Sequence, residues 1–297
     1  MKLVLDLIDK LNYKFGIIFF KNSNLLTFNL YRYFYKKKIC NLKYLETDFI
    51  NSFYNNGYAK LGKVNLSSLS DLKNLLNIQN PSDNDNHHIE YKITPDIYNI
   101  IKKIIQTQLS DKLKVLEKYY NQKIVLAFLT ISRNYPSSKK DESYSNFFHT
   151  DAYVYNMFKI FINLNDVSEK NGPLTLVKKE YNKEFLNKFN YKDRKSYKRN
   201  LDNHDDLFFK NIGKAGEVFL CSTTELLHRA GDPYPGEFRD MIFLNFVAQP
   251  TKSKNITVLE YEDLTHKDDV LIKKLSKIRG LKNLIRFYYK NFKEKLI

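Results

Sequence analysis

Histidine and aspartate recur in this chain at a spacing that suits a metal ion. A histidine followed two positions later by an aspartate occurs three times, as His149/Asp151, His204/Asp206 and His266/Asp268. In an extended segment, residues two apart point to the same face, so an imidazole and a carboxylate spaced in this way can reach one divalent ion. The spacing alone is weak evidence, and the residues around each pair must decide between them.

The context favours His149 and Asp151. They are followed by an apolar, strand-like run and, much later, by His228, whereas His204 lies in a polar run and His266 has no histidine after it. We therefore expect His149, Asp151 and His228 to bind one metal ion. Two imidazoles and one carboxylate on one side of an ion leave its other positions open, which is the ligand set of non-haem Fe(II) sites.

The order of several motifs resembles the phytanoyl-CoA dioxygenase family of Fe(II)/2-oxoglutarate-dependent oxygenases. The matching motifs are Phe53-Tyr54-Asn55-Asn56-Gly57-Tyr58, His149-Thr150-Asp151, Asn171-Gly172-Pro173-Leu174, Gly216-Glu217, His228 and, eleven positions on, Arg239. The resemblance covers residues 45–250. One departure is Lys178-Lys179-Glu180-Tyr181, where the family has P-G-S-H.

The resemblance implies a chemistry and a set of roles. Fe(II) is held by His149, Asp151 and His228, and 2-oxoglutarate and O2 take the remaining positions. Oxidative decarboxylation then gives succinate and CO2, and an aspartate ligand implies hydroxylation, or a related oxidation, of a small-molecule or carrier-linked substrate. Arg239 is expected to bind the far carboxylate of 2-oxoglutarate, because guanidinium groups pair with carboxylates through two hydrogen bonds. Arg133 is the next candidate for that role, and Phe161 is expected either to line the cosubstrate or to belong to the core.

The apolar patterns predict helices first and then a majority of short strands. Helices are expected from Thr47 or Asp48 to Tyr54, ended by Gly57, from a Ser70 cap to Ile78, and from Pro95 to Tyr120. Strands are expected over residues 58–64, 124–131, 157–164, 174–177, 216–220, 226–230 and 239–247. This order predicts an α+β, mainly β, fold: a double-stranded β-helix (a cupin-like jelly roll) braced by N-terminal helices, with the metal ligands inside one mouth.

The net charge of +16 is concentrated at the two ends of the chain. Residues 1–45 and 267–297 each carry +7, which leaves +2 for the residues between them. We predict a basic amphipathic arm over 1–45, an oxygenase domain over 46–250 with an insertion at 180–210, and a basic helical extension over 251–297. The nearly neutral middle argues against a nucleic-acid-binding protein. The arms either pack on the domain or contact an anionic membrane surface.

The remaining features indicate a cytoplasmic protein. Two cysteines, Cys40 and Cys221, make no disulfide framework. The sequence contains no run of about 18 apolar residues, so no membrane-spanning helix is expected. The competing function is a non-catalytic, cupin-like binding module, which would need no iron. The sequence indicates neither the substrate nor the oligomeric state.

Overall fold

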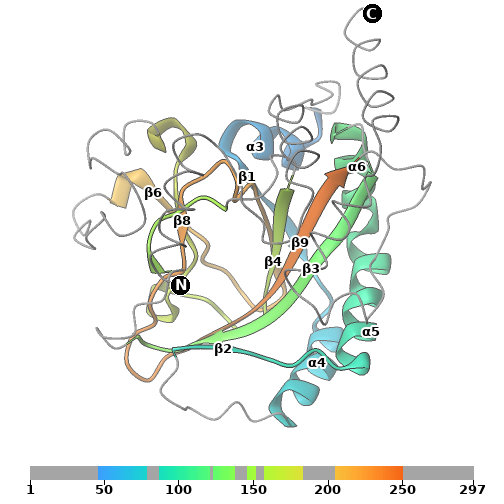
Figure 1. Cartoon of the computed structure of the whole chain (residues 1–297), viewed down its shortest axis with the longest axis vertical. Helices are drawn as coiled ribbons and strands as arrows, with labels where there is room; N and C mark the ends of the chain where they lie inside the picture. Colours follow the sequence, from blue (N-terminus) through green and yellow to red (C-terminus); the bar gives the residue numbers. More distant parts are fainter. Residues whose placement is uncertain are drawn as a thin grey trace, which may run out of the picture.

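The computed structural model describes residues 46–78, 87–120, 123–137, 146–151, 157–182 and 205–249. These residues form two antiparallel sheets, of six and three strands, with helices on one side (Figure 1). The expected arms, most of the 180–210 insertion, His204 and His266 lie outside the described residues.

The larger sheet has the strand order β1-β7-β4-β9-β3-β2. Its strands are β1 (Tyr58–Lys63), β2 (His88–Glu90), β3 (Lys123–Asn134), β4 (Met157–Asn163), β7 (Glu217–Cys221) and β9 (Arg239–Gln249). The central strand β4 reads Met-Phe-Lys-Ile-Phe-Ile-Asn and is buried along nearly its whole length. Such a strand must be covered on both faces, and two different layers cover it.

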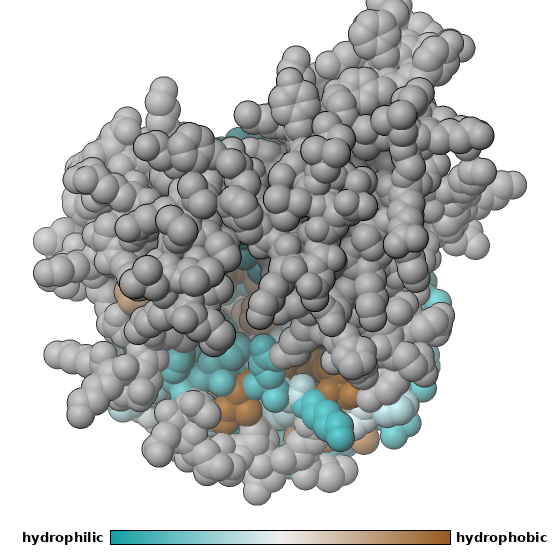
Figure 2. All heavy atoms as spheres, in the orientation of Figure 1, coloured by the Kyte–Doolittle hydropathy of each residue, from teal (hydrophilic) through white to brown (hydrophobic). Residues whose placement is uncertain are grey.

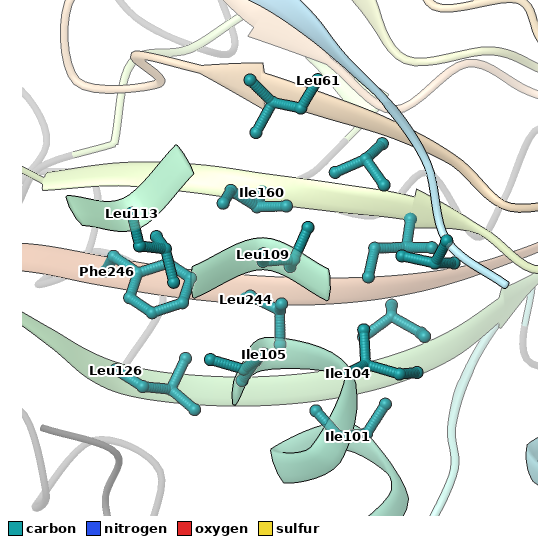
Figure 3. Close-up of a cluster of buried hydrophobic side chains, with 14 of the residues drawn as sticks. Leu61, Ile101, Ile104, Ile105, Leu109, Leu113, Leu126, Ile160, Leu244 and Phe246 are labelled. Atoms are coloured by element: carbon teal, nitrogen blue, oxygen red, sulfur yellow. The ribbon is translucent and has the colours of Figure 1, made fainter. Parts of the chain in front are cut away.

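Helices cover one face of the larger sheet. They are α3 (Asp48–Asn56), α4 (Leu66–Ile78), α5 (Pro95–Ile104), the π-helical turn η2 (Ile105–Leu109) and α6 (Ser110–Tyr120). Ile101, Ile105 and Leu109 lie over the sheet residues Leu126 and Leu244 (Figure 3). This layer is the main hydrophobic core, and it leaves the opposite face of the same strands for the site.

The smaller sheet, in the order β6-β5-β8, lies over that opposite face. Its strands are β5 (Thr175–Val177), β6 (Phe208–Lys210) and β8 (His228–Arg229). Between the sheets lies a buried set of mostly apolar side chains, which we call the interior cluster: Phe161, Leu174, Leu176, Phe219, Cys221, Leu226 and Met241. Phe148, Val177, Leu207, Phe208 and Leu227 form a separate cluster.

The helix ends show which local signals were sufficient. Helix α5 begins at Pro95 and Gly57 ends α3 in the left-handed region, both as predicted. Thr94 caps α5, with its Oγ1 accepting from the Ile97 amide 3.3 Å away. The prediction that Ser70 begins a helix was wrong, because α4 begins at Leu66. The Asn65 side chain accepts from the Ser67 amide at 3.0 Å and takes the capping role instead.

The described surface is mixed in character. Its exposed large hydrophobic residues are Leu66, Ile212 and Tyr234, and on the face shown in Figure 2 hydrophilic and hydrophobic residues lie beside one another. Within the described ranges, no helix has the length and hydrophobicity needed to cross a bilayer. The motif that departs from the family, Lys178 to Tyr181, forms a short turn, with a 3-10 helix at Lys179–Tyr181.

Candidate metal centre

The three predicted ligands meet between the two sheets. His149 and His228 face each other across an antiparallel bridge, with His149 N donating to His228 O at 2.9 Å and His228 N donating to His149 O at 2.8 Å. Residues directly opposite each other in such a bridge project from the same face. The two imidazole rings consequently lie 4.3 Å apart, centroid to centroid.

Asp151 joins the pair because it lies one pleat beyond His149. Its Oδ1 is 3.9 Å from His149 Nε2, and its Oδ2 is 3.9 Å from His228 Nε2. The three ligand atoms all lie within 4.8 Å of one another. Ligand atoms bound side by side at roughly 2.1 Å lie about 3 Å apart, so a shared ion would draw these atoms somewhat closer together than the 3.9 Å separations. We call these three residues the metal triad.

Hydrogen bonds orient both imidazoles for metal binding. His149 Nδ1 donates to Phe147 O at 2.7 Å, and His228 Nδ1 donates to Leu226 O at 3.1 Å. With the proton on Nδ1, each Nε2 presents its lone pair to the centre. The chain itself therefore selects the tautomer that a metal ion needs.

Asp151 stays ionised in this setting. Burial would raise the pKa of its carboxyl, but the charge of Lys159, together with favourable interactions with His228 and His149, outweighs burial and holds the pKa well below its usual range. Lys159 Nζ lies 2.6 Å from Asp151 Oδ2. The described residues thus offer two neutral nitrogen donors and one carboxylate, a donor set that suits Fe(II).

Arg239 is a buried cation at the start of β9. Its side chain reaches the loop that leads into β5, where Nη1 donates to the Gly172 carbonyl, and the residue is only 3% exposed. Burial alone lowers its pKa, to about 10. No acidic side chain within the described residues balances its charge, so the site is suited to an anion from outside those residues.

Arg133 is committed to a partner inside the protein. Its Nε and Nη2 donate to Asp240 Oδ1 and Oδ2 at 2.7 and 2.6 Å, and its guanidinium lies 4.2 Å from the centre of the Phe238 ring. The paired hydrogen bonds to Asp240 hold the pKa of Arg133 well above its usual range. Arg133 is thus a structural clamp, which leaves Arg239 as the candidate for anion binding.

Phe161 lies in the interior cluster. Its ring meets that of Phe243 edge-on at 5.4 Å and that of Phe219 at 6.3 Å. These contacts account for Phe161 as a core residue.

The residue that the sequence analysis missed is Lys159. It shares the interior face with Phe161, and the visible signal was a lysine in the middle of an otherwise apolar strand.

The sequence matches no protein-family model and no curated protein. Solved structures with a similar arrangement include SnoN, described as a non-heme alpha ketoglutarate dependent epimerase from nogalamycin biosynthesis. It is 12% identical with a TM-score of 0.45, over 72% of this chain and 89% of SnoN. HygX from Streptomyces hygroscopicus, crystallised with nickel and 2-oxoglutarate, is 14% identical with a TM-score of 0.49, over 70% of this chain and 88% of HygX. EctD from S. alaskensis, crystallised with 2-oxoglutarate and 5-hydroxyectoine, is 16% identical with a TM-score of 0.45, over 67% of this chain and 74% of EctD.

Proposed function

We propose that this protein is a non-haem Fe(II)- and 2-oxoglutarate-dependent oxygenase. The observation that carries the proposal is the convergence of His149, Asp151 and His228, with both histidines held in the metal-binding tautomer. Three protein ligands on one side of an ion leave room for a chelating cosubstrate and O2.

We further propose that the two antiparallel sheets form a double-stranded β-helix, and the path of the chain supports this. Along the chain, β3 lies in the larger sheet, the His149 segment bridges to the smaller one, and β4 returns to the larger. Strands β5 and β6 follow in the smaller sheet, and β7, β8 and β9 then alternate between the two. Alternation of an antiparallel chain between two facing sheets supports a jelly roll.

Each protein group has a distinct part in the proposed reaction. The Nε2 atoms of His149 and His228 and the Asp151 carboxylate bind the ion, and Arg239 binds the far carboxylate of 2-oxoglutarate at the Gly172 loop. Phe161 and its aromatic neighbours exclude water from the space between the sheets. Fe(II) with 2-oxoglutarate and O2 would supply oxidative decarboxylation, in which one oxygen atom goes to succinate and the other hydroxylates a small-molecule or carrier-linked substrate.

Equilibrium binding under anaerobic conditions tests the proposal. We expect Fe(II) to bind with one ion per chain and 2-oxoglutarate to bind tightly only when the metal is present. His228→Ala should abolish tight metal binding, whereas His204→Ala, in another His-x-Asp pair, should not. Equal losses in the two variants would mean that the metal triad is not the site.

A further inference from the structure

Lys159 is an unexpected charge inside the sandwich. It lies on the central strand β4, opposite Cys221 on β7 and Asn245 on β9. Two residues along the strand, on the same face, Phe161 belongs to the interior cluster. The Lys159 side chain is only 17% exposed, and its Nζ lies 2.6 Å from Asp151 Oδ2. Burying a cation in such a place is costly, so a role at the site is a reasonable expectation.

The ammonium group of Lys159 disfavours the binding of a metal ion by electrostatic repulsion. Its ammonium already balances the Asp151 carboxylate, and both histidines are neutral donors. A divalent ion would therefore add two positive charges beside an existing one, and like charges repel strongly in a partly buried site. An anion bound to the same ion would relieve that repulsion.

Geometry indicates which anion can do so. Neighbouring ligand atoms on an octahedral ion at roughly 2.1 Å lie about 3 Å apart. A carboxylate oxygen on the ion beside Asp151 would thus come within reach of a lysine that already touches the other Asp151 oxygen. Arg239, by contrast, lies at the start of β9, three steps of two residues from Asn245, the residue opposite Lys159. Both cations therefore face the space between the sheets, Lys159 beside the metal triad and Arg239 at the Gly172 loop.

We propose that Lys159 Nζ binds the metal-bound carboxylate of 2-oxoglutarate and thereby makes the binding of metal and of anion mutually dependent. This inference rests on the proposed function and names a second anion-binding residue for it. Because coupling between two ligands is reciprocal, each must strengthen the binding of the other by the same factor. Arg239 holds the far end of the cosubstrate and takes no part in this coupling.

Lys159→Gln tests the proposal, because a glutamine amide can still donate to Asp151 but carries no charge. Titration calorimetry measures the binding of two probes, Mn(II) alone and oxalate in the presence of Mn(II). Oxalate is chosen because it presents only a metal-chelating end and has no far carboxylate for Arg239. Affinity for Mn(II) alone should rise by roughly tenfold, since a unit charge near a divalent ion is removed. Affinity for oxalate in the presence of Mn(II) should fall by about tenfold or more, as expected for loss of a charged hydrogen bond.

Three further variants separate the possible outcomes. Lys210→Gln removes a lysine that pairs with Glu169 at 3.1 Å and should change neither affinity. Arg239→Met should weaken binding of 2-oxoglutarate but not of oxalate. Lys159→Arg keeps the charge and should keep the coupling, and far-UV circular dichroism verifies that each variant is folded.

The contrary results are distinct. If Lys159→Gln weakens Mn(II) binding and leaves the coupling to oxalate intact, Lys159 only positions Asp151 and the proposal is wrong. Unchanged affinities for both probes would refute it as well. A parent protein that binds no Mn(II) would instead contradict the proposed function, and the coupling with it.

Discussion

Replacing Arg239 with methionine should have opposite effects on stability and on cosubstrate binding. The Arg239 guanidinium is buried, and burial lowers its pKa from 12.5 to about 10. At neutral pH the group is charged in both the folded and the unfolded chain, so the folded state bears the full cost of burial, which is relieved only as the pH rises above the folded pKa. At 1.36 kcal/mol per pKa unit, that cost is about 3 kcal/mol.

Removing the arginine removes this cost of burial, but a lost hydrogen bond offsets part of the gain in stability. The Gly172 carbonyl loses the hydrogen bond from Arg239, and a buried acceptor without a partner costs about 1–3 kcal/mol. We therefore expect the free energy of unfolding of Arg239→Met, without ligands, to be equal to that of the parent or higher by up to about 2 kcal/mol. Its affinity for 2-oxoglutarate should fall by about a hundredfold or more, because a buried charge pair can no longer form.

Urea unfolding followed by circular dichroism measures the first effect, since the chain has no tryptophan to report by fluorescence. Arg133→Met is the matched control. It leaves the Asp240 carboxylate, with 13% of its side chain exposed, without its partner and should cost about 3 kcal/mol. If Arg239→Met were destabilised as much as Arg133→Met and still bound 2-oxoglutarate normally, Arg239 would be a tie between the sheets and not an anion-binding group.

Three other predictions concern packing and reactivity. Phe53→Ala should lower the free energy of unfolding by about 3–5 kcal/mol, because the fully buried ring packs edge-on against Tyr119 and Phe158; urea unfolding checks this. Gly172→Ala should destabilise the fold and raise the concentration of 2-oxoglutarate needed for half-saturation, because at a φ of 63° the added Cβ would lie 2.5 Å from the Asp232 backbone. The control, Gly236→Ala, has open space around it and should lower the free energy of unfolding by only about 1 kcal/mol. Burial raises the pKa of the Cys221 thiol far above neutrality, so peptide mapping should find it unalkylated by iodoacetamide at pH 8 until the protein is unfolded.

Local sequence signals were sufficient where a single segment determines its own geometry. Thr94-Pro95 and Gly57 set helix ends, and the two-residue period of a strand placed His149 and Asp151 on one face. The long helical pattern from Pro95 to Tyr120 was predicted as continuous, and the structure inserts the π-helical turn η2 within it. The periodicity did not indicate that turn.

Relations between distant segments were beyond local signals. The bridge that sets His149 opposite His228 joins segments far apart in the chain, and no local pattern specifies which residues lie opposite each other. The same holds for the contact between Lys159 and Asp151 and for the clamp of Arg133 on Asp240. A sequence pattern shows that a lysine interrupts an apolar strand, but only the fold shows which carboxylate lies beside it.

The two arms and the insertion remain predictions. The basic excess of residues 1–45 and 267–297 allows either packing on the domain or contact with an anionic membrane. Co-sedimentation with anionic and neutral vesicles across a salt series, for the whole chain, distinguishes these two alternatives. Salt-sensitive binding to anionic vesicles alone would support membrane contact.

Formation of succinate from 2-oxoglutarate is the most direct measurement of the central claim. In air, the parent protein should form succinate only when both Fe(II) and 2-oxoglutarate are supplied, and Arg239→Met should require far more 2-oxoglutarate. The His228→Ala variant, which lacks one ligand of the metal triad, should form none above background. If the parent binds both Fe(II) and 2-oxoglutarate and yet forms no more succinate than His228→Ala, the protein is a binding module and the proposed catalysis is wrong.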